Sequence, residues 1–156
     1  MDAVSEARLS LINPKLADKI RTLAGMLAQE SVFLKITQGL RSWDQQQKLY
    51  DQGRALPGKI VTNCPGGWSW HNFGLAVDCL PETVEGQADW NAEHPQWKRM
   101  ELLGASLGLS SGALFRSFPD APHFQLTGRF PVSPDAEVRQ LFKDGGMQAV
   151  WDEANL

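Results

Sequence analysis

The stretch Ser69-Trp70-His71-Asn72-Phe73-Gly74-Leu75-Ala76-Val77-Asp78 is the most informative part of this chain for its fold. From position 73 onward, apolar residues alternate with small or polar ones, and this period of two predicts a central β-strand that carries Asp78. A carboxylate is rarely buried in such a strand unless it is paired with a cation or binds a metal. Gly74 and Ala76 are expected to leave room for a metal beside Asp78.

A second stretch, Asp120-Ala121-Pro122-His123, completes a candidate metal site. His71, Asp78 and His123 offer three ligands to one metal ion, and three protein ligands with a fourth position open to water are typical of catalytic zinc. Asp120 lies three residues before His123, where it can handle protons without being a ligand. The pattern therefore predicts a hydrolytic metal site.

Each of these residues also has a purely structural interpretation. His71 could cap a helix, Asp78 could form a salt bridge with Arg41, and His123 could be a buried histidine bonded to a backbone carbonyl. Arg41 could instead pair with a helix carboxylate, although its position after a strand-end turn favours a role in the site. The polar residues around His71 and the carboxylate beside His123 favour the metal site, whereas His94 lacks such surroundings and is interpreted as a loop residue.

Length and composition indicate one ordinary globular domain spanning residues 1–156, with a formal net charge of −3. The charges are scattered, and the absence of a basic stripe argues against nucleic-acid binding. No apolar run is long enough to span a bilayer. The N-terminal segment lacks a basic start followed by an apolar core, so we expect no Sec signal peptide and synthesis in the cytoplasm.

The two cysteines, Cys64 and Cys79, do not form a metal-binding or redox motif. Cys79 directly follows Asp78 in the predicted strand, so its side chain is expected to lie on the opposite face of the sheet as a buried free thiol. A Cys64–Cys79 bridge remains the alternative, disfavoured in a reducing compartment.

Local patterns predict a small α+β domain in which helices pack on an antiparallel sheet, with the site at strand ends and loops. Ser42 and Gln45 predict a capping box at the start of a helix. Asn13-Pro14 predicts another helix start, and Gly108 a helix end. The predicted elements are a helix at 14–27, a strand at 32–37, a helix from 42 to near 53, a long functional loop at 54–67, a helix at 95–107, a short strand at 123–126, and a terminal helix from Ser133-Pro134 that breaks at Gly145-Gly146 before a last turn at 147–151.

The two motifs resemble the SxHxxGxAxD and (E/D)xxH motifs of the D-Ala-D-Ala carboxypeptidase and L-alanyl-D-glutamate peptidase family of zinc enzymes. This family includes vancomycin-resistance dipeptidases and many phage endolysins. Other parts of the chain follow the family pattern in order: Thr37-Gln38-Gly39-Leu40-Arg41-Ser42, Gln46, Leu49-Tyr50, Gly53-Arg54, Pro57-Gly58, Thr62-Asn63 and Gly145-Gly146-Met147-Gln148-Ala149-Val150-Trp151. Aspartate at position 120 is similar to the endolysin branch. The segment Ser111-Gly112-Ala113-Leu114-Phe115 departs from the Trp-Gly-Gly-Asp-Trp run of related endolysins.

The resemblance implies a hedgehog/D-Ala-D-Ala-peptidase-like fold and one zinc ion bound by His71, Asp78 and His123. It further implies that Asp120 is the catalytic acid/base and that Arg41 meets the substrate near the metal. The residues expected to contact the substrate are Arg41, Gln46, Ser69 and Trp68. Ser69 and Asn72 are expected to orient the metal ligands, and one of Trp68 and Trp70 to line the substrate groove, with core packing as its alternative.

The expected function is that of a zinc-dependent phage endolysin that cleaves the L-alanyl-D-glutamate bond of the peptidoglycan stem peptide. Such an enzyme would accumulate as a monomer in the host cytoplasm and reach the periplasm and cell wall after a holin opens the membrane. It would carry no separate cell-wall-binding domain and would not insert stably into the membrane. Two alternatives remain: a D-Ala-D-Ala carboxypeptidase or dipeptidase, and a non-catalytic zinc-containing module that binds the wall. A chance match of the motif in a structural protein is remote.

Overall fold

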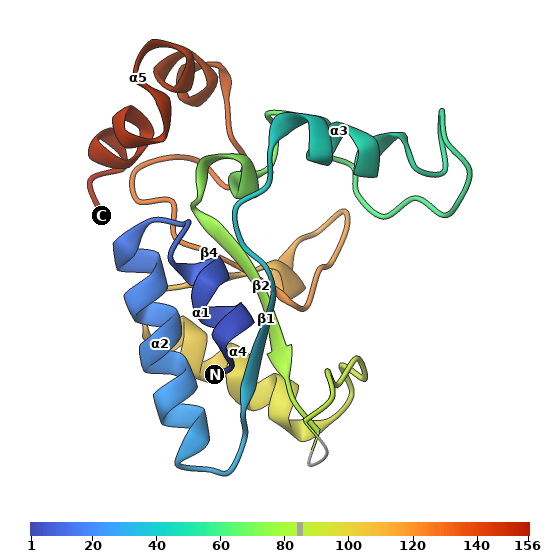
Figure 1. Ribbon diagram of the computed structural model, residues 1–156, viewed down its shortest axis with the longest axis vertical. Coiled ribbons are helices and arrows are strands. Elements are labelled where there is room, and N and C mark those ends of the chain that lie inside the picture. The colour runs from blue at the N-terminus through green and yellow to red at the C-terminus, as the bar shows by residue number, and fades with distance from the viewer. Residues whose placement is uncertain (84–85) are drawn as a thin grey trace.

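The computed structural model describes residues 1–83 and 86–156 and has an α+β architecture (Figure 1). Within these residues the strands form one antiparallel sheet in the order β1-β2-β4-β3. In chain order the elements are α1 (Ala3–Leu9), α2 (Pro14–Ala28), β1 (Leu34–Gln38), α3 (Trp43–Asp51), the 3-10 helix η1 (Trp70–Phe73), β2 (Ala76–Pro81), α4 (Pro95–Ser106), β3 (Ser110–Ser111), the 3-10 helix η2 (Gly112–Leu114), β4 (His123–Gln125) and α5 (Ala136–Ala154). The predicted fold class is confirmed.

The helix starts predicted at Asn13-Pro14 and at Ser42 carry the expected caps. The Asn13 side chain accepts hydrogen bonds from the backbone N–H groups of Lys15 and Leu16 at 2.9 and 3.3 Å, with Pro14 at the first helical position. Ser42 and Gln45 form the reciprocal capping box. These bonds satisfy backbone donors that a helix leaves without partners at its start.

Helices α1, α2 and α4 cover one face of the sheet and form the main hydrophobic core with it (Figure 1). Cys79 is buried in this core, on the face opposite Asp78, and both cysteines are unpaired. A second cluster joins η1 and the start of β2 to α5; it contains Trp70, Phe73, Leu75, Ala76, Phe130, Val138, Val150 and Ala154. The metal motif therefore runs between two cores, which fix it from both sides.

Helix α1 was not predicted from the sequence. It begins with Asp2, whose side chain accepts a hydrogen bond from the Ser5 backbone N–H at 2.7 Å. The Ser5 hydroxyl accepts the Ile36 N–H at 3.0 Å, and Arg8 donates to the Ile36 carbonyl. Side chains of α1 thus occupy backbone groups on the outer edge of β1, which would otherwise be free to pair with another strand.

The central strand starts later than predicted, at Ala76 rather than near Phe73. Residues 70–73 instead form η1, which ends at Gly74 in the left-handed region with φ of 64°. A Cβ on Gly74 would lie 3.1 Å from the Trp151 ring, so this glycine is needed for packing against α5. Ala76 is buried in the second core. The expectation that Gly74 makes room for a metal is therefore wrong, whereas the same expectation for Ala76 stays a prediction.

The C-terminal helix also starts later than predicted, because Asp135 and not the Ser133-Pro134 pair caps it. Its predicted break is confirmed, since Gly146 has non-helical angles (φ 68°, ψ −160°). The remaining helices agree with the predicted ones to within about two residues, and the loop at 54–67 contains neither helix nor strand. Across the described residues, no helix is both long and apolar enough to cross a membrane.

Candidate metal centre and substrate cavity

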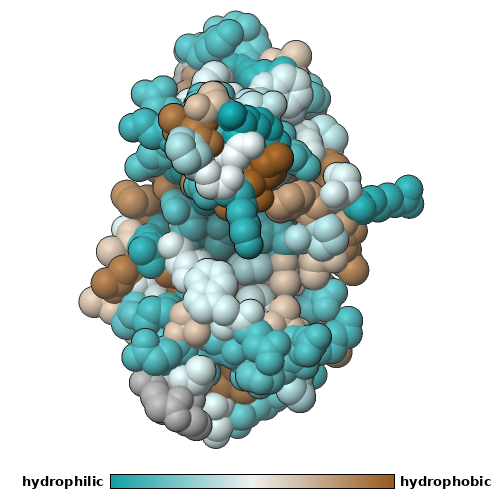
Figure 2. Space-filling view, turned by 90° about the vertical axis from the view of Figure 1, so that its right-hand side faces the viewer, coloured by the Kyte–Doolittle hydropathy of each residue, from teal (hydrophilic) through white to brown (hydrophobic). Residues whose placement is uncertain are grey.

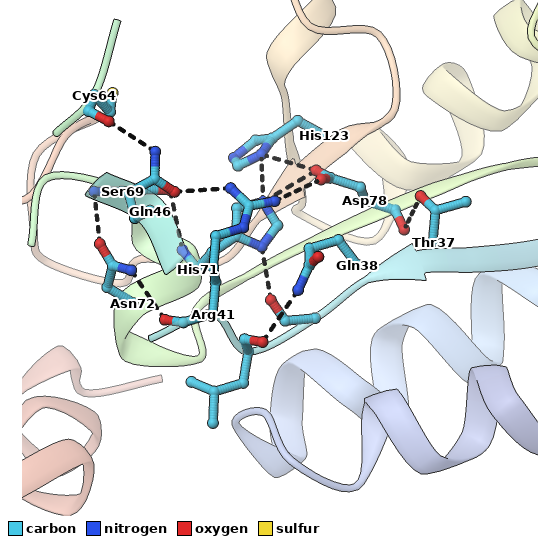
Figure 3. Close-up of polar contacts among 12 residues, drawn as sticks. Thr37, Gln38, Arg41, Gln46, Cys64, Ser69, His71, Asn72, Asp78 and His123 are labelled. Atoms are coloured by element: carbon cyan, nitrogen blue, oxygen red, sulfur yellow. Dashed lines mark hydrogen bonds and ion pairs between the residues drawn. The ribbon is translucent and has the colours of Figure 1, made fainter. Parts of the chain in front are cut away.

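The three predicted ligands converge at the meeting point of η1, β2 and β4 (Figure 3). Asp78 and His123 are directly opposite each other in the antiparallel pair of β2 and β4. His71 reaches the same point from η1. His71 Nε2 lies 3.0 Å from Asp78 Oδ1 and 3.2 Å from His123 Nδ1, and the last two atoms are 3.3 Å apart. No other group of this kind occurs in the described part of the chain.

The outer nitrogens of both histidines are held by hydrogen-bond acceptors. His71 Nδ1 donates to the Gly39 carbonyl at 2.8 Å, and His123 Nε2 donates to Gln125 Oε1 at 3.0 Å. The Gln125 amide is oriented in turn, because its Nε2 donates to the Val132 carbonyl at 3.0 Å. In the neutral rings the nitrogens that face each other therefore carry lone pairs, as metal-ligating histidines do.

This donor set fits a zinc ion. Two lone pairs and a carboxylate oxygen face one another at 3.0–3.3 Å, an arrangement that needs a positive charge between them. Zinc–ligand bonds of about 2.0–2.1 Å at tetrahedral angles place donor atoms roughly 3.3 Å apart, close to these separations. Gly39, Gln125 and the β2–β4 register thus prepare the three atoms for a metal.

Protons compete with a metal for these atoms. Burial raises the pKa of Asp78, but the charges and hydrogen bonds of His71 and His123 outweigh it and hold that pKa well below its usual range. Burial lowers the pKa of His123, but Asp78 and Gln125 raise it by more. Metal affinity should therefore fall as the pH falls and His123 becomes protonated.

Arg41 follows β1 by three residues, and its guanidinium lies between Gln46 and Asp78 (Figure 3). Its Nη2 is 3.6 Å from Asp78 Oδ2, and its Nη1 donates to Gln46 Oε1 at 2.8 Å. The Arg41 backbone N–H donates to the His71 carbonyl, and Asn72 donates to the Arg41 carbonyl. The guanidinium is thus fixed beside the donor set, and the salt bridge to Asp78 coexists with the metal geometry.

Asp120 lies in the loop between η2 and β4 and lines the same cavity as the three donors. Its backbone N–H donates to the Gly112 carbonyl at 2.9 Å, and its carbonyl accepts the His123 N–H at 3.1 Å. Burial and the Asp78 charge raise the pKa of Asp120 above its usual value, against the opposing effect of His123, His71 and Arg41. A carboxylate with a raised pKa beside a metal site is suited to accept and return a proton.

Gly112 permits this close approach. A Cβ on this residue would lie 2.5 Å from the Asp120 carbonyl oxygen and 2.7 Å from the His123 Cβ. We expect Gly112→Ala to lower kcat by roughly 100-fold while the protein still folds, because displacements near 1 Å at reacting groups cost about that much. Steady-state kinetics with circular dichroism checks this. Wild-type kcat would contradict it; Gly25→Ala, where the added Cβ meets no neighbour, is the control.

A cavity of about 730 Å³ opens over the donor set, large enough for an extended peptide. Figure 2 shows a hollow in the middle of the face that carries α3, with apolar side chains gathered above it. The expected substrate residues Arg41, Ser69 and Trp68 line this cavity. Trp68 is 45% exposed, and the Arg139 guanidinium stacks 3.8 Å from its ring centre.

Gln46 is not among the residues that line the cavity. Gln46 is buried behind Arg41, and its amide donates to the Cys64 carbonyl at 2.7 Å. It therefore positions Arg41 and holds the loop at 54–67. Trp68 and Trp70 both line the cavity, but Trp70 is packed in the second core and donates to the Val132 carbonyl, so Trp68 is the exposed one of the two.

Ser69 and Asn72 orient backbone rather than ligand rings. Ser69 accepts the His71 N–H, and Asn72 accepts the Gly67 N–H at 2.9 Å while donating to the Arg41 carbonyl at 2.9 Å. Gly39 and Gln125, which orient the ligand rings, were not predicted. Gln125 could have been found, because it lies two residues after His123 in a strand and so shares its face.

His94 is the cap residue before α4 and bonds Asp89 through Nδ1 at 2.7 Å, away from the donor set, as predicted for a loop residue. The cavity lining adds residues that sequence reasoning had not singled out: Trp90, Arg116 and Phe118. They lie in loops without a helical or strand period, so no pattern pointed to them.

Comparisons with known proteins agree with this geometry. A family model described as D-alanyl-D-alanine carboxypeptidase matches residues 62–126, the part that contains all three donors and Asp120. The peptidoglycan L-alanyl-D-glutamate endopeptidase CwlK of Bacillus subtilis (strain 168) is 31% identical over 122 residues, which cover 74% of this chain and 73% of CwlK.

Two solved structures share the fold. The L-Ala D-Glu endopeptidase ChiX of Serratia marcescens superposes with a TM-score of 0.60 at 22% identity, covering 94% of this chain and 92% of ChiX. The D,D-pentapeptidase VanY from a VanB-type resistance cassette, solved with Zn(II), has a TM-score of 0.55 at 14% identity, covering 89% of this chain and 83% of VanY. The chain therefore belongs to the D-Ala-D-Ala carboxypeptidase and L-alanyl-D-glutamate peptidase family, whose members are zinc-dependent peptidases of peptidoglycan.

Proposed function

We propose that this protein is a zinc-dependent endopeptidase that cleaves the L-Ala–D-Glu bond of the peptidoglycan stem peptide. The observation that carries the proposal is the convergence of His71 Nε2, Asp78 Oδ1 and His123 Nδ1 in a cavity that Asp120, which is not one of the converging donors, also lines. The three donors would hold the ion and Asp120 would remain available for proton transfer, which is the division of roles that hydrolysis requires.

Bound zinc would polarise the scissile carbonyl and lower the pKa of water toward about 7. Asp120 takes a proton from the water that attacks the carbonyl carbon. As the C–N bond breaks, Asp120 returns that proton to the leaving amine of D-Glu. The raised pKa of Asp120, caused by burial and the Asp78 charge, makes this carboxylate a stronger base than an ordinary aspartate.

Arg41 stabilises the negative charge that develops on the carbonyl oxygen during the attack. Its guanidinium is held in place by Gln46 at 2.8 Å and directed by Asp78 at 3.6 Å, so little reorganisation is needed. Ser69 and Trp68 line the cavity and contact the bound peptide.

The choice of bond is supported by the relatives named L-Ala–D-Glu endopeptidases, CwlK and ChiX. A second candidate is a D-Ala-D-Ala carboxypeptidase or dipeptidase, which the description of the family model favours. The same metal chemistry serves both, since the shape of the cavity decides which bond lies over the donors.

We further propose that residues 1–156 act as one catalytic unit, as a monomer with a single zinc ion, in the role of a phage endolysin. The enzyme would be made in the host cytoplasm and would reach the wall after a holin opens the membrane. Expression in Escherichia coli should lyse cells only when the membrane is permeabilised, for example with chloroform. Lysis without permeabilisation would contradict this role, and an Asp120→Asn variant controls for toxicity.

Mass spectrometry of digested muropeptides tests the choice of bond. The expected products carry a new N-terminal D-Glu, and they should be absent after chelator treatment. Release of D-Ala instead would support the carboxypeptidase. Intact muropeptides with the zinc-loaded enzyme would contradict both candidates and favour a wall-binding module.

A further inference from the structure

The loop between η2 and β4 presents Arg116 to the cavity. The Gly112 carbonyl accepts both the Phe115 N–H at 3.0 Å and the Asp120 N–H at 2.9 Å, which closes the loop at its base. The Phe115 ring lies 5.5 Å from the His123 ring, so this loop packs directly against a metal donor. Arg116 follows Phe115 and lines the cavity.

Arg116 differs from the other charged groups that line the cavity. Arg41 already bonds to Gln46 and Asp78. Asp78 is itself one of the metal donors, and Asp120 lies close enough to Arg41 and the histidines for their charges to lower its pKa. Arg116 is exposed, and in residues 1–83 and 86–156 it makes no hydrogen bond or ion pair. It is thus a cation in the cavity that is available to a ligand.

The proposed substrate offers an anion at a fixed position. D-Glu joins the next stem residue through its γ-carboxyl, so its α-carboxylate is free and sits on the carbon that bears the scissile nitrogen. In some walls this group is amidated to D-isoglutamine, which has nearly the same shape and no charge. A guanidinium binds a carboxylate through paired charge-assisted hydrogen bonds that a neutral amide cannot replace.

We propose that Arg116 binds the α-carboxylate of D-Glu and makes the enzyme selective for stem peptides in which this group is not amidated. This inference rests on the proposed cleavage of the L-Ala–D-Glu bond.

The test compares acetyl-L-Ala-γ-D-Glu-diaminopimelate with the same peptide containing D-isoglutamine. Wild-type kcat/KM should be at least about tenfold higher for the D-Glu peptide, a typical effect of one charge-assisted contact at a partly exposed site. Arg116→Gln should lower kcat/KM by about tenfold for the D-Glu peptide and leave the D-isoglutamine peptide unchanged. Arg116→Lys should retain part of the preference.

Arg21→Gln is the matched control, because it removes the same charge from an exposed ion pair on α2. This substitution should leave kcat/KM unchanged for both the D-Glu and the D-isoglutamine peptide. Dissociation constants measured by calorimetry in an Asp120→Asn background should show the same preference for D-Glu, which separates binding from turnover. A third peptide, with D-Glu unchanged and a diaminopimelate carboxylate amidated, shows which of the two carboxylates Arg116 binds. Its kcat/KM should equal that of the D-Glu peptide.

Equal kcat/KM for the first two peptides, or an equal loss on both in Arg116→Gln, would overturn the role of Arg116 and leave the cleavage reaction intact. Loss of cleavage on amidation of diaminopimelate alone would assign Arg116 to the wrong carboxylate and overturn the proposal. Failure to cut any L-Ala–D-Glu bond, with hydrolysis elsewhere in the stem peptide, would refute the proposed function and this inference with it.

Discussion

Asp120→Asn is expected to lower kcat by about 10²–10⁴-fold while the protein folds and binds zinc as before, since this is the usual contribution of a general acid–base group. Asparagine keeps the size of the side chain and its place beside Gly112 and His123, but it cannot accept the proton. Because Asp120 is not one of the three converging donors, its loss should leave the metal content unchanged. Kinetics on purified muropeptides and metal analysis measure the two effects.

Two variants make this test specific. Asp18→Asn removes an exposed carboxylate that pairs with Arg21 on α2, and it should keep wild-type kcat. Asp120→Glu retains a carboxylate and should recover part of the activity. A kcat within tenfold of wild type in Asp120→Asn would refute the role of Asp120, and loss of zinc in this variant would make Asp120 a ligand instead.

Two helix starts in this chain were predicted correctly from local capping signals. Asn13-Pro14 and the Ser42–Gln45 box are short-range signals, and the structure contains both caps. Helix α1 was missed because its stability depends on tertiary contacts, the bonds of Ser5 and Arg8 to β1. The strand start was misplaced because Gly74 serves long-range packing against Trp151, which no window of sequence reports.

The candidate site also contains residues that local motifs predicted and residues whose positions depend on long-range contacts. His71, Asp78, His123 and Asp120 were predicted from motif spacing, and the structure brings them together because β2 and β4 pair in register. Gln46 was expected to contact the substrate but is buried behind Arg41, since its amide spans Arg41 and Cys64. Trp90, Arg116 and Phe118 were not predicted, because they belong to no motif, and neither a period nor a cap determines where their loop side chains lie.

Removal of zinc with a chelator is expected to abolish peptidase activity and to lower Tm by about 5–10 °C. A ligand present at about 100 times its Kd stabilises the native state by roughly 2.7 kcal/mol, and for a chain of this size each kcal/mol shifts Tm by about 2–4 °C. Without the ion, the lone pairs of His71 and His123 and the Asp78 carboxylate face one another at 3.0–3.3 Å. Differential scanning calorimetry measures Tm and a peptidase assay measures activity, each on the chelated protein before and after zinc is restored.

His71→Ala should remove the dependence of Tm on zinc, because it deletes one of three donors. His94→Ala is the matched control; His94 bonds Asp89 outside the donor set, so its loss should leave the zinc effect intact. An unchanged Tm and full activity after chelation of the wild type would show that neither stability nor peptidase activity depends on the metal.

Anomalous diffraction at the zinc absorption edge, from crystals of the zinc-loaded protein, tests the metal centre most directly. One peak is expected, about 2.0–2.2 Å from His71 Nε2, Asp78 Oδ1 and His123 Nδ1, with the Asp120 carboxylate outside bonding distance. A peak bound by other residues, or no peak among these three atoms, would contradict the proposed centre.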